Sequence, residues 1–160
     1  MASLDAPKRL VVTALVAGVG SGVPSTLVAA LRGDDPLAAT RAAGTLVPGR
    51  RSRPGAVAGA AVHAVLTLWW TAVLSAGLRW VRGGTLLGAL GGAGIAAVDL
   101  GVVARRYPAI RALPQAPQWA DHVLFGLIVG CCTAKNAPKR RGGQTGRHVA
   151  VRHPPEDAVR

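Results

Sequence analysis

The chain has 160 residues, of which 50% are hydrophobic and only 16% are charged, and its formal net charge is +12. Soluble domains carry about 25% charged residues, so this composition argues against an ordinary soluble fold. A basic excess can also indicate nucleic-acid binding, but here Lys and Arg stand in short clusters beside apolar stretches, which is typical of membrane proteins and argues against nucleic acid as a partner.

Four apolar stretches predict the fold class. They cover about 10–31, 56–78, 84–104 and 117–134. A helix needs about 20 mostly apolar residues to cross ~30 Å of hydrocarbon, and the first three stretches have that length. The fourth is shorter and carries two ionisable residues near its start. We therefore expect an all-α integral membrane four-helix bundle over 1–134, with short loops, followed by a disordered basic tail over 135–160.

The first stretch and the loop after it contain local signals. A soluble bundle would need a polar face at helical spacing, and residues 10–30 show no charged face. Pro24 is expected to bend this helix, because proline removes a backbone hydrogen bond. In the loop that follows, Asp34 or Asp35 can cap a short helix over Pro36–Thr45.

Loop lengths and charges predict how the chain crosses the membrane. The second loop, 79–83, is so short that the second and third stretches should form a tight antiparallel hairpin. With four spans, the N-terminus, second loop and tail share one side and hold 11 Lys and Arg, against 8 on the other side. The positive-inside rule then places both termini in the cytoplasm of a multi-pass plasma membrane protein. The excess is small, so inverted or dual insertion stays open.

The third stretch has a regular pattern of small residues. Gly84, Gly88, Gly92 and Ala96 recur at every fourth position, which lets another helix approach closely. Weaker stripes of the same kind occur in the other three stretches. They predict a tight bundle in the lipid bilayer, and leave open a homo-oligomer or a larger membrane complex.

Ionisable residues inside the apolar stretches are the candidate functional site. His63 and Asp99 lie about 8–10 Å below the same membrane surface at 1.5 Å per residue, and we expect them on facing helices within reach of one another. Asp121, His122 and Ser25 fall near the same surface. The five residues predict one polar cluster inside the bundle. It could fix the register of the helices, or serve transport or a proton relay.

The chain contains no recognisable catalytic or metal-binding motif, so we expect no catalytic residue, no cofactor and no metal site. Its only cysteines, Cys131 and Cys132, are adjacent and too close for ordinary disulfide geometry. The leading hypothesis is a small membrane protein with a polar site for transport or proton relay. A structural or accessory subunit of a larger complex is the alternative, and a membrane-embedded enzyme is a third hypothesis.

Several segments also resemble a family of small multi-pass membrane proteins of high-GC, actinobacterial-type bacteria, a family without an assigned activity. The segments that carry the resemblance are Gly22–Thr26, Arg32–Gly44, His63, Val98–Gly101, Arg105–Arg111 and Asp121–His122. The resemblance implies the membrane class and implies nothing about a reaction.

Overall fold

The chain is described by a computed structural model that covers residues 5–79, 81 and 84–135. Its helical elements are α1 (Ala6–Ser21), α2 (Val23–Arg32), α3 (Ala38–Ala43), η1 (Gly44–Leu46), α4 (Ala56–Leu78), α5 (Gly84–Gly101), η2 (Val103–Arg106), α6 (Pro108–Arg111) and α7 (Gln115–Lys135). Within these ranges there is no strand, which confirms the all-α prediction. The tail expected to be disordered lies beyond Lys135, outside the described residues.

Three helical segments have the length and composition needed to cross a membrane. They are Ala6–Arg32, Ala56–Leu78 and Gly84–Arg106. The fourth predicted span, 117–134, differs from them. It forms α7, which is long enough, but Gln118, Asp121 and His122 in its first turns lower its hydropathy.

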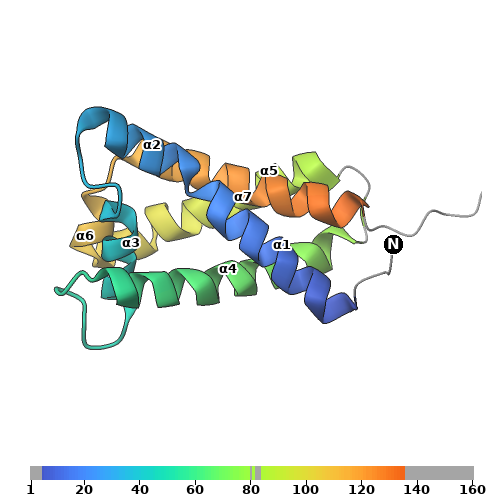
Figure 1. The fold of residues 1–160 in the computed structure, drawn as a ribbon, viewed down its shortest axis with the longest axis horizontal. Coiled ribbons are helices and arrows are strands. Elements are labelled where there is room, and N and C mark those ends of the chain that lie inside the picture. Colours follow the sequence, from blue (N-terminus) through green and yellow to red (C-terminus); the bar gives the residue numbers. More distant parts are fainter. Residues whose placement is uncertain (1–4, 80, 82–83, 136–160) are drawn as a thin grey trace, which may run out of the picture.

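The long helices lie side by side along one axis (Figure 1). One end of the molecule, which we call the loop end, is formed by residues 33–55 and 102–114 and includes α3 and α6. The other, the terminal end, contains the start of α1, the end of α4, the start of α5 and the end of α7. α5 packs mainly against α7, and α1 packs against both α4 and α7. The α4–α5 contact is much smaller, although the two helices are consecutive.

The molecule is apolar on its outer surface. Large side chains such as Val57, Val65, Leu86 and Leu90 are 60–87% exposed. In the most apolar part of each of the three long segments, at most 22% of the residues are buried. The buried core is small and includes Ala17, Ile95, Phe125 and Val129. A soluble protein would bury such side chains, whereas a bilayer can solvate them.

Glycine governs the contact between α5 and α7. A Cβ atom built at Gly88 would overlap the carbonyl oxygen of Gly126, and one built at Gly92 would overlap that of His122. The stripe expected to admit a close neighbour thus faces the stripe of α7. Ala96, the last member of the α5 stripe, is fully buried.

The first long helical segment, Ala6–Arg32, is broken near Pro24, where the sequence predicts a bend. α1 ends at Ser21, Gly22 forms a turn, and α2 begins at Val23 with proline in its first turn. Because proline has no N–H and the break interrupts the helical ladder, the first turn of α2 has N–H groups that need acceptors elsewhere.

The segment between α2 and α4, residues 33–55, which we call loop one, folds back onto the start of α4. Its helix, α3, begins two residues later than Pro36, and the N–H of Leu37 donates to Asp35 Oδ1 at 2.9 Å. The carbonyl oxygen of Thr40 lies so close to Gly59 that a Cβ there would overlap it. Arg51 links the two loops, donating from Nε to the carbonyl oxygen of Arg106 at 2.7 Å while its guanidinium lies 5.5 Å from the ring centre of Tyr107.

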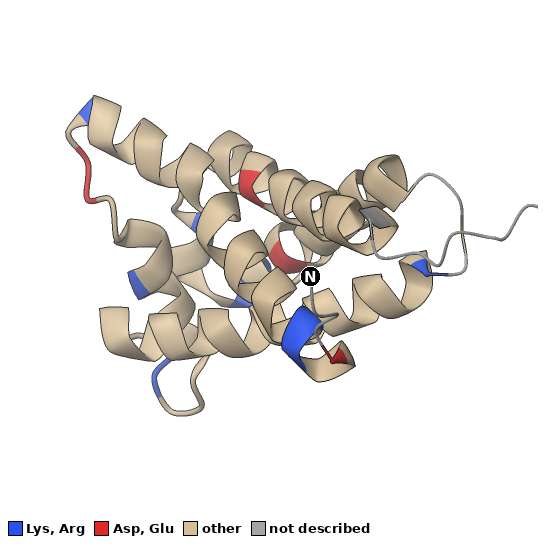
Figure 2. Cartoon of the chain, turned by 45° about the vertical axis from the view of Figure 1, so that its right-hand side comes forward, with Lys and Arg blue, Asp and Glu red and all other residues tan. Residues whose placement is uncertain are grey.

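Charged residues are distributed unevenly along the molecule. Lys and Arg gather near its two ends, while acidic positions also occur along α5 and α7 (Figure 2). The latter are Asp99 and Asp121. This distribution leaves the middle of the molecule without Lys or Arg residues among those described.

Candidate functional site

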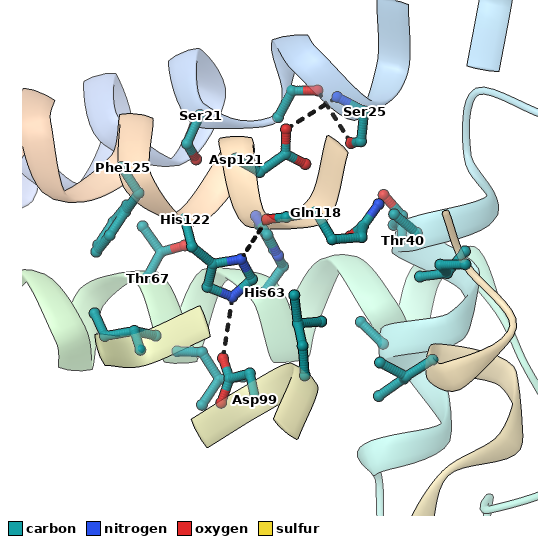
Figure 3. Close-up of a pocket in the computed structure, with 18 of the residues that line it drawn as sticks. Ser21, Ser25, Thr40, His63, Thr67, Asp99, Gln118, Asp121, His122 and Phe125 are labelled. Atoms are coloured by element: carbon teal, nitrogen blue, oxygen red, sulfur yellow. Dashed lines mark hydrogen bonds and ion pairs between the residues drawn. The ribbon is translucent and has the colours of Figure 1, made fainter. Parts of the chain in front are cut away.

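A cavity of about 190 Å³ lies between the helices near the loop end. Its wall is mostly apolar, with Trp70, Ile95 and Phe125 among the larger side chains. Its polar side chains come from α1, α2, α3, α4, α5 and α7: Ser21, Ser25, Thr26, Thr40, His63, Thr67, Asp99, Gln118, Asp121 and His122. The cavity is therefore apolar over most of its wall, with polar side chains from six helices among its lining (Figure 3).

All five residues of the predicted polar cluster line this cavity. Ser25 comes from α2, His63 from α4, Asp99 from α5, and Asp121 and His122 from α7. The two neighbours on α7 point in different directions, because successive residues of a helix differ by about 100°. Asp121 reaches α2, and His122 reaches α5.

The pair formed by Asp99 and His122 holds one proton between its two members. His122 Nδ1 lies 2.7 Å from the carbonyl oxygen of Gln118, and since a carbonyl can only accept, Nδ1 must carry the hydrogen. His122 Nε2 lies 3.3 Å from Asp99 Oδ2. A hydrogen bond there needs one further proton, held either by the imidazole as a cation or by the carboxyl as a neutral acid. Figure 3 marks both contacts of the His122 ring. The pair thus has two states that differ in which side holds this proton.

Asp121 stabilises the start of α2, just after the break between α1 and α2. Its Oδ1 accepts the backbone N–H of Ser25 at 2.9 Å, in the first turn of α2. A carboxylate at a helix N-terminus both satisfies a free donor and interacts favourably with the helix dipole. Asp121 therefore acts as a cap provided by another helix, a role that the sequence alone did not indicate.

His63 lines the cavity with the rest of the predicted cluster, but its partner differs from the one predicted. The sequence indicated a pairing of His63 with Asp99 across a hairpin, but Asp99 bonds to His122 instead. The reason is that α5 packs against α7 rather than α4. His63 lines the cavity and keeps an exposed surface, so it lies at the margin of the cavity.

A second hollow, of about 400 Å³, adjoins the first on the side of the loop end. The two share Ser25, Pro36, Ala39, Leu113 and Gln118 in their walls. Asp34 and Asp35 line its outer part, and no Lys or Arg does. This hollow, which we call the vestibule, lies beside the cavity and is lined by residues of α2, α3, α7 and the loops that precede α3 and α7.

Sequence reasoning missed two contributors to the site. Gln118 is 92% buried and its backbone carbonyl sets the tautomer of His122. Thr67, which also lines the cavity, stands one helical turn after His63. The signal for Gln118 was its position four residues before His122, one turn back along the same helix.

Comparison with known proteins gives no match to a family model, to a curated protein or to a solved structure. Among the described residues, no three His, Cys, Asp or Glu side chains are grouped so that they could hold a metal ion. The geometry of the cavity is therefore the basis for any functional assignment.

Proposed function

We propose that this chain is an integral membrane protein with four helical spans that moves protons across the membrane through the Asp99–His122 pair. The apolar outer surface supports the membrane assignment, because exposed side chains such as Val65 and Leu90 would be costly in water. α7 is the fourth span, and its polar first turns face the cavity rather than lipid.

One observation carries the proposal. The hydrogen bond of Gln118 fixes one ring nitrogen of His122, so a single proton is left to be shared between the other nitrogen and Asp99. A pair that exchanges one proton in a cavity adjoining the surface can load and release it repeatedly. The vestibule shares five wall residues with the cavity, and we place the route between the pair and water at the loop end there.

An accessory subunit is the alternative, and it was expected to bind partners through its glycine faces. Gly84, Gly88 and Gly92 already face α7 within this chain, where each would meet backbone if it carried a Cβ. A partner protein would have to use other surfaces. This arrangement favours the transport proposal over the accessory one.

Proton movement is tested with the purified full-length chain in liposomes that contain a pH-sensitive dye. A potassium diffusion potential set by valinomycin drives protons inward. We expect acidification well above that of empty liposomes, and Asp99→Asn should reduce it at least about tenfold, since the pair can then no longer exchange a proton. Asp5→Asn is the matched control, because Asp5 lies at the terminal end. Equal rates for the wild type and Asp99→Asn would refute the proposal.

Membrane orientation gives a separate prediction. In a variant without Cys131 and Cys132, a cysteine at Ser52 in loop one should react with an impermeant maleimide on intact cells. A cysteine at Val81, in the second loop, should react only after permeabilisation, because the side with 11 Lys and Arg stays in the cytoplasm. The reverse pattern would mean the opposite orientation, and labelling of both from outside would mean dual insertion.

A further inference from the structure

The cavity near the loop end has an excess of acidic side chains. Among the described residues, its wall contains two carboxyl groups, Asp99 and Asp121, and neither Lys nor Arg. The other titratable side chains of the wall are His63 from α4 and His122 from α7, and α1, α2 and α3 contribute none. Both imidazoles can be neutral near pH 7, so the fixed charge of the wall is negative.

The net charge of the cavity follows from its protons. With its shared proton, the Asp99–His122 pair is neutral in either of its two states. Asp121 is favoured as a carboxylate, because its Oδ1 accepts the N–H of Ser25 at the start of a helix (Figure 3). With His63 neutral, the cavity holds one unbalanced negative charge, and a second when the pair loses its proton. Because a buried charge is costly unless it is paired, a ligand with one positive charge is favoured.

The hydrogen bonds already made in the wall leave acceptors for a ligand. Ser21 Oγ donates to the carbonyl oxygen of Gly18 at 3.4 Å, and Ser25 Oγ donates to that of Gly22 at 3.5 Å. A hydroxyl has a single hydrogen, so these two oxygens can then only accept from a ligand. An ammonium group has donors only and therefore suits them, whereas a carboxylate or a phosphate would face them with further acceptors.

The apolar part of the wall points to an organic cation rather than a metal ion. Among the described residues, no His, Cys, Asp or Glu side chains form a group of three that could hold a metal. Trp70 and Phe125 line the cavity, and aromatic rings attract organic cations through their faces as well as by apolar contact. An engineered cavity of about 150 Å³ in another protein binds benzene. The volume of about 190 Å³ here therefore suits a single ring, or a short branched chain, that carries an amino group.

From these observations we infer that the cavity binds a small protonated amine with an apolar body, and that this amine competes with the shared proton of the Asp99–His122 pair. Asp121 is the counter-ion of the ammonium group, and the aromatic side chains of the wall contact the apolar body. The bound cation weakens the hold of the pair on its proton, because like charges repel. A proton lost in this way passes to water and leaves a neutral imidazole and a carboxylate, while the amine keeps its own protons. The competition rests on the proposed function, whereas binding of the amine does not.

Equilibrium dialysis tests the binding with the purified full-length chain in lipid nanodiscs. The probe is radiolabelled benzylamine, which has one ring and, like the amine of Lys, holds its proton at neutral pH. Empty nanodiscs of the same lipid measure the uptake by lipid, which is subtracted. We expect saturable binding of one benzylammonium per chain. Uptake equal to that of empty nanodiscs would overturn the inference.

Three unlabelled competitors test the chemistry of the site. Benzyl alcohol has the same ring without the charge, and benzoate has the opposite charge. Each should displace the probe at least about tenfold less well than unlabelled benzylammonium, because neither can pair with a buried carboxylate. Equal displacement by benzyl alcohol would mean that the cavity does not select charge, which would contradict an amine site. Equal displacement by sodium chloride would mean a site for an inorganic ion, and would also contradict it.

Asp121→Asn tests the counter-ion without removing the cap. An asparagine oxygen can still accept the N–H of Ser25, so the start of α2 stays in place. The affinity for benzylammonium should fall at least about tenfold, because the ammonium loses its charged partner. Asp5→Asn is the matched control, since Asp5 pairs with Lys8 at the terminal end, and it should bind like the wild type. Equal affinity in all three proteins would overturn the inference.

Proton release tests the competition. Benzylammonium added near pH 7 to the protein in weakly buffered solution should release protons, which a pH-indicator dye measures. Asp99→Asn should bind the amine and release fewer protons, because linkage between the two ligands is reciprocal and needs the pair. His63 and Asp121, the other titratable groups of the wall outside the pair, are present in both proteins, so the difference reports on the pair. Equal release by the two proteins would overturn the competition.

The outcomes separate the amine site from the proposed function. Asp121-dependent binding of benzylammonium, combined with liposome rates that do not depend on Asp99, would overturn the proposed function alone. Asp99-dependent liposome rates without displaceable binding of benzylammonium would overturn the amine site alone.

Discussion

Replacing Gly92 with alanine is expected to destabilise the protein by about 1–3 kcal/mol, because the added methyl group overpacks a closed contact. A Cβ at this position would overlap the carbonyl oxygen of His122, and backbone cannot rotate away as a side chain can. α5 and α7 must therefore separate. Since Gly92 contacts the backbone of His122 itself, the variant should also lengthen the Asp99–His122 hydrogen bond and reduce proton movement.

Gly94→Ala is the matched control for that prediction. Gly94 lies on the same helix, two residues further on, and a Cβ there would meet no atom within 4 Å. Its stability should equal that of the wild type or exceed it by up to about 1 kcal/mol, because alanine has a higher helix propensity than glycine. Unfolding by a denaturing detergent, added to protein in mild micelles, measures both variants. Equal loss in the two would show that contact with α7 is not the cause of the destabilisation.

Asp99 and His122 are expected to be coupled in stability, whereas Asp99 and His63 are not. In a double-mutant cycle, Asp99→Asn and His122→Ala should deviate from additivity by about 0.6–1.7 kcal/mol, the range found for hydrogen bonds between membrane helices. The reason is that either change alone already removes their shared hydrogen bond, with its atoms 3.3 Å apart.

The cycle of Asp99→Asn with His63→Ala serves as the internal control. His63 has no hydrogen bond to Asp99, so these two effects should add within about 0.5 kcal/mol. The same unfolding measurement in micelles applies to both cycles. Coupling between Asp99 and His63 that exceeds the coupling between Asp99 and His122 would mean that the pairing first predicted from the sequence is the correct one.

The sequence predicted which faces of the helices pack, but not which helix each face meets. The stripe from Gly84 to Ala96 indicates a close neighbour on one side of α5. The four-residue period of this stripe does not indicate which helix packs against it. The short second loop suggested that this helix would be α4. α7 is favoured because its own Gly126 and Gly130 lie opposite, which allows backbone to approach backbone. A loop limits the distance between helix ends and leaves the packed faces undetermined.

The same limit applies to the candidate site. Depth along each helix could be counted from the sequence, and all five predicted residues do line one cavity. The hydrogen-bond partner of each side chain could not be predicted in this way, because it depends on how each helix is rotated about its own axis. Thus Asp121 reaches the broken span while its neighbour His122 reaches Asp99. The sequence showed a cluster of ionisable groups, and only the packing separates a cap from a proton-sharing pair.

Conformational entropy distinguishes the two sides of the cavity. A long side chain loses up to about 2 kcal/mol of rotamer freedom when it is packed, whereas Gly and Ala lose none. α5 and α7 meet through Gly88, Gly92 and Gly126, so they close together without restricting side chains. α2, by contrast, has no buried residue and is held at its start by Asp121. The α5–α7 side of the cavity is therefore closely packed at little cost in side-chain entropy, whereas the position of α2 depends on its contact with Asp121 rather than on buried side chains.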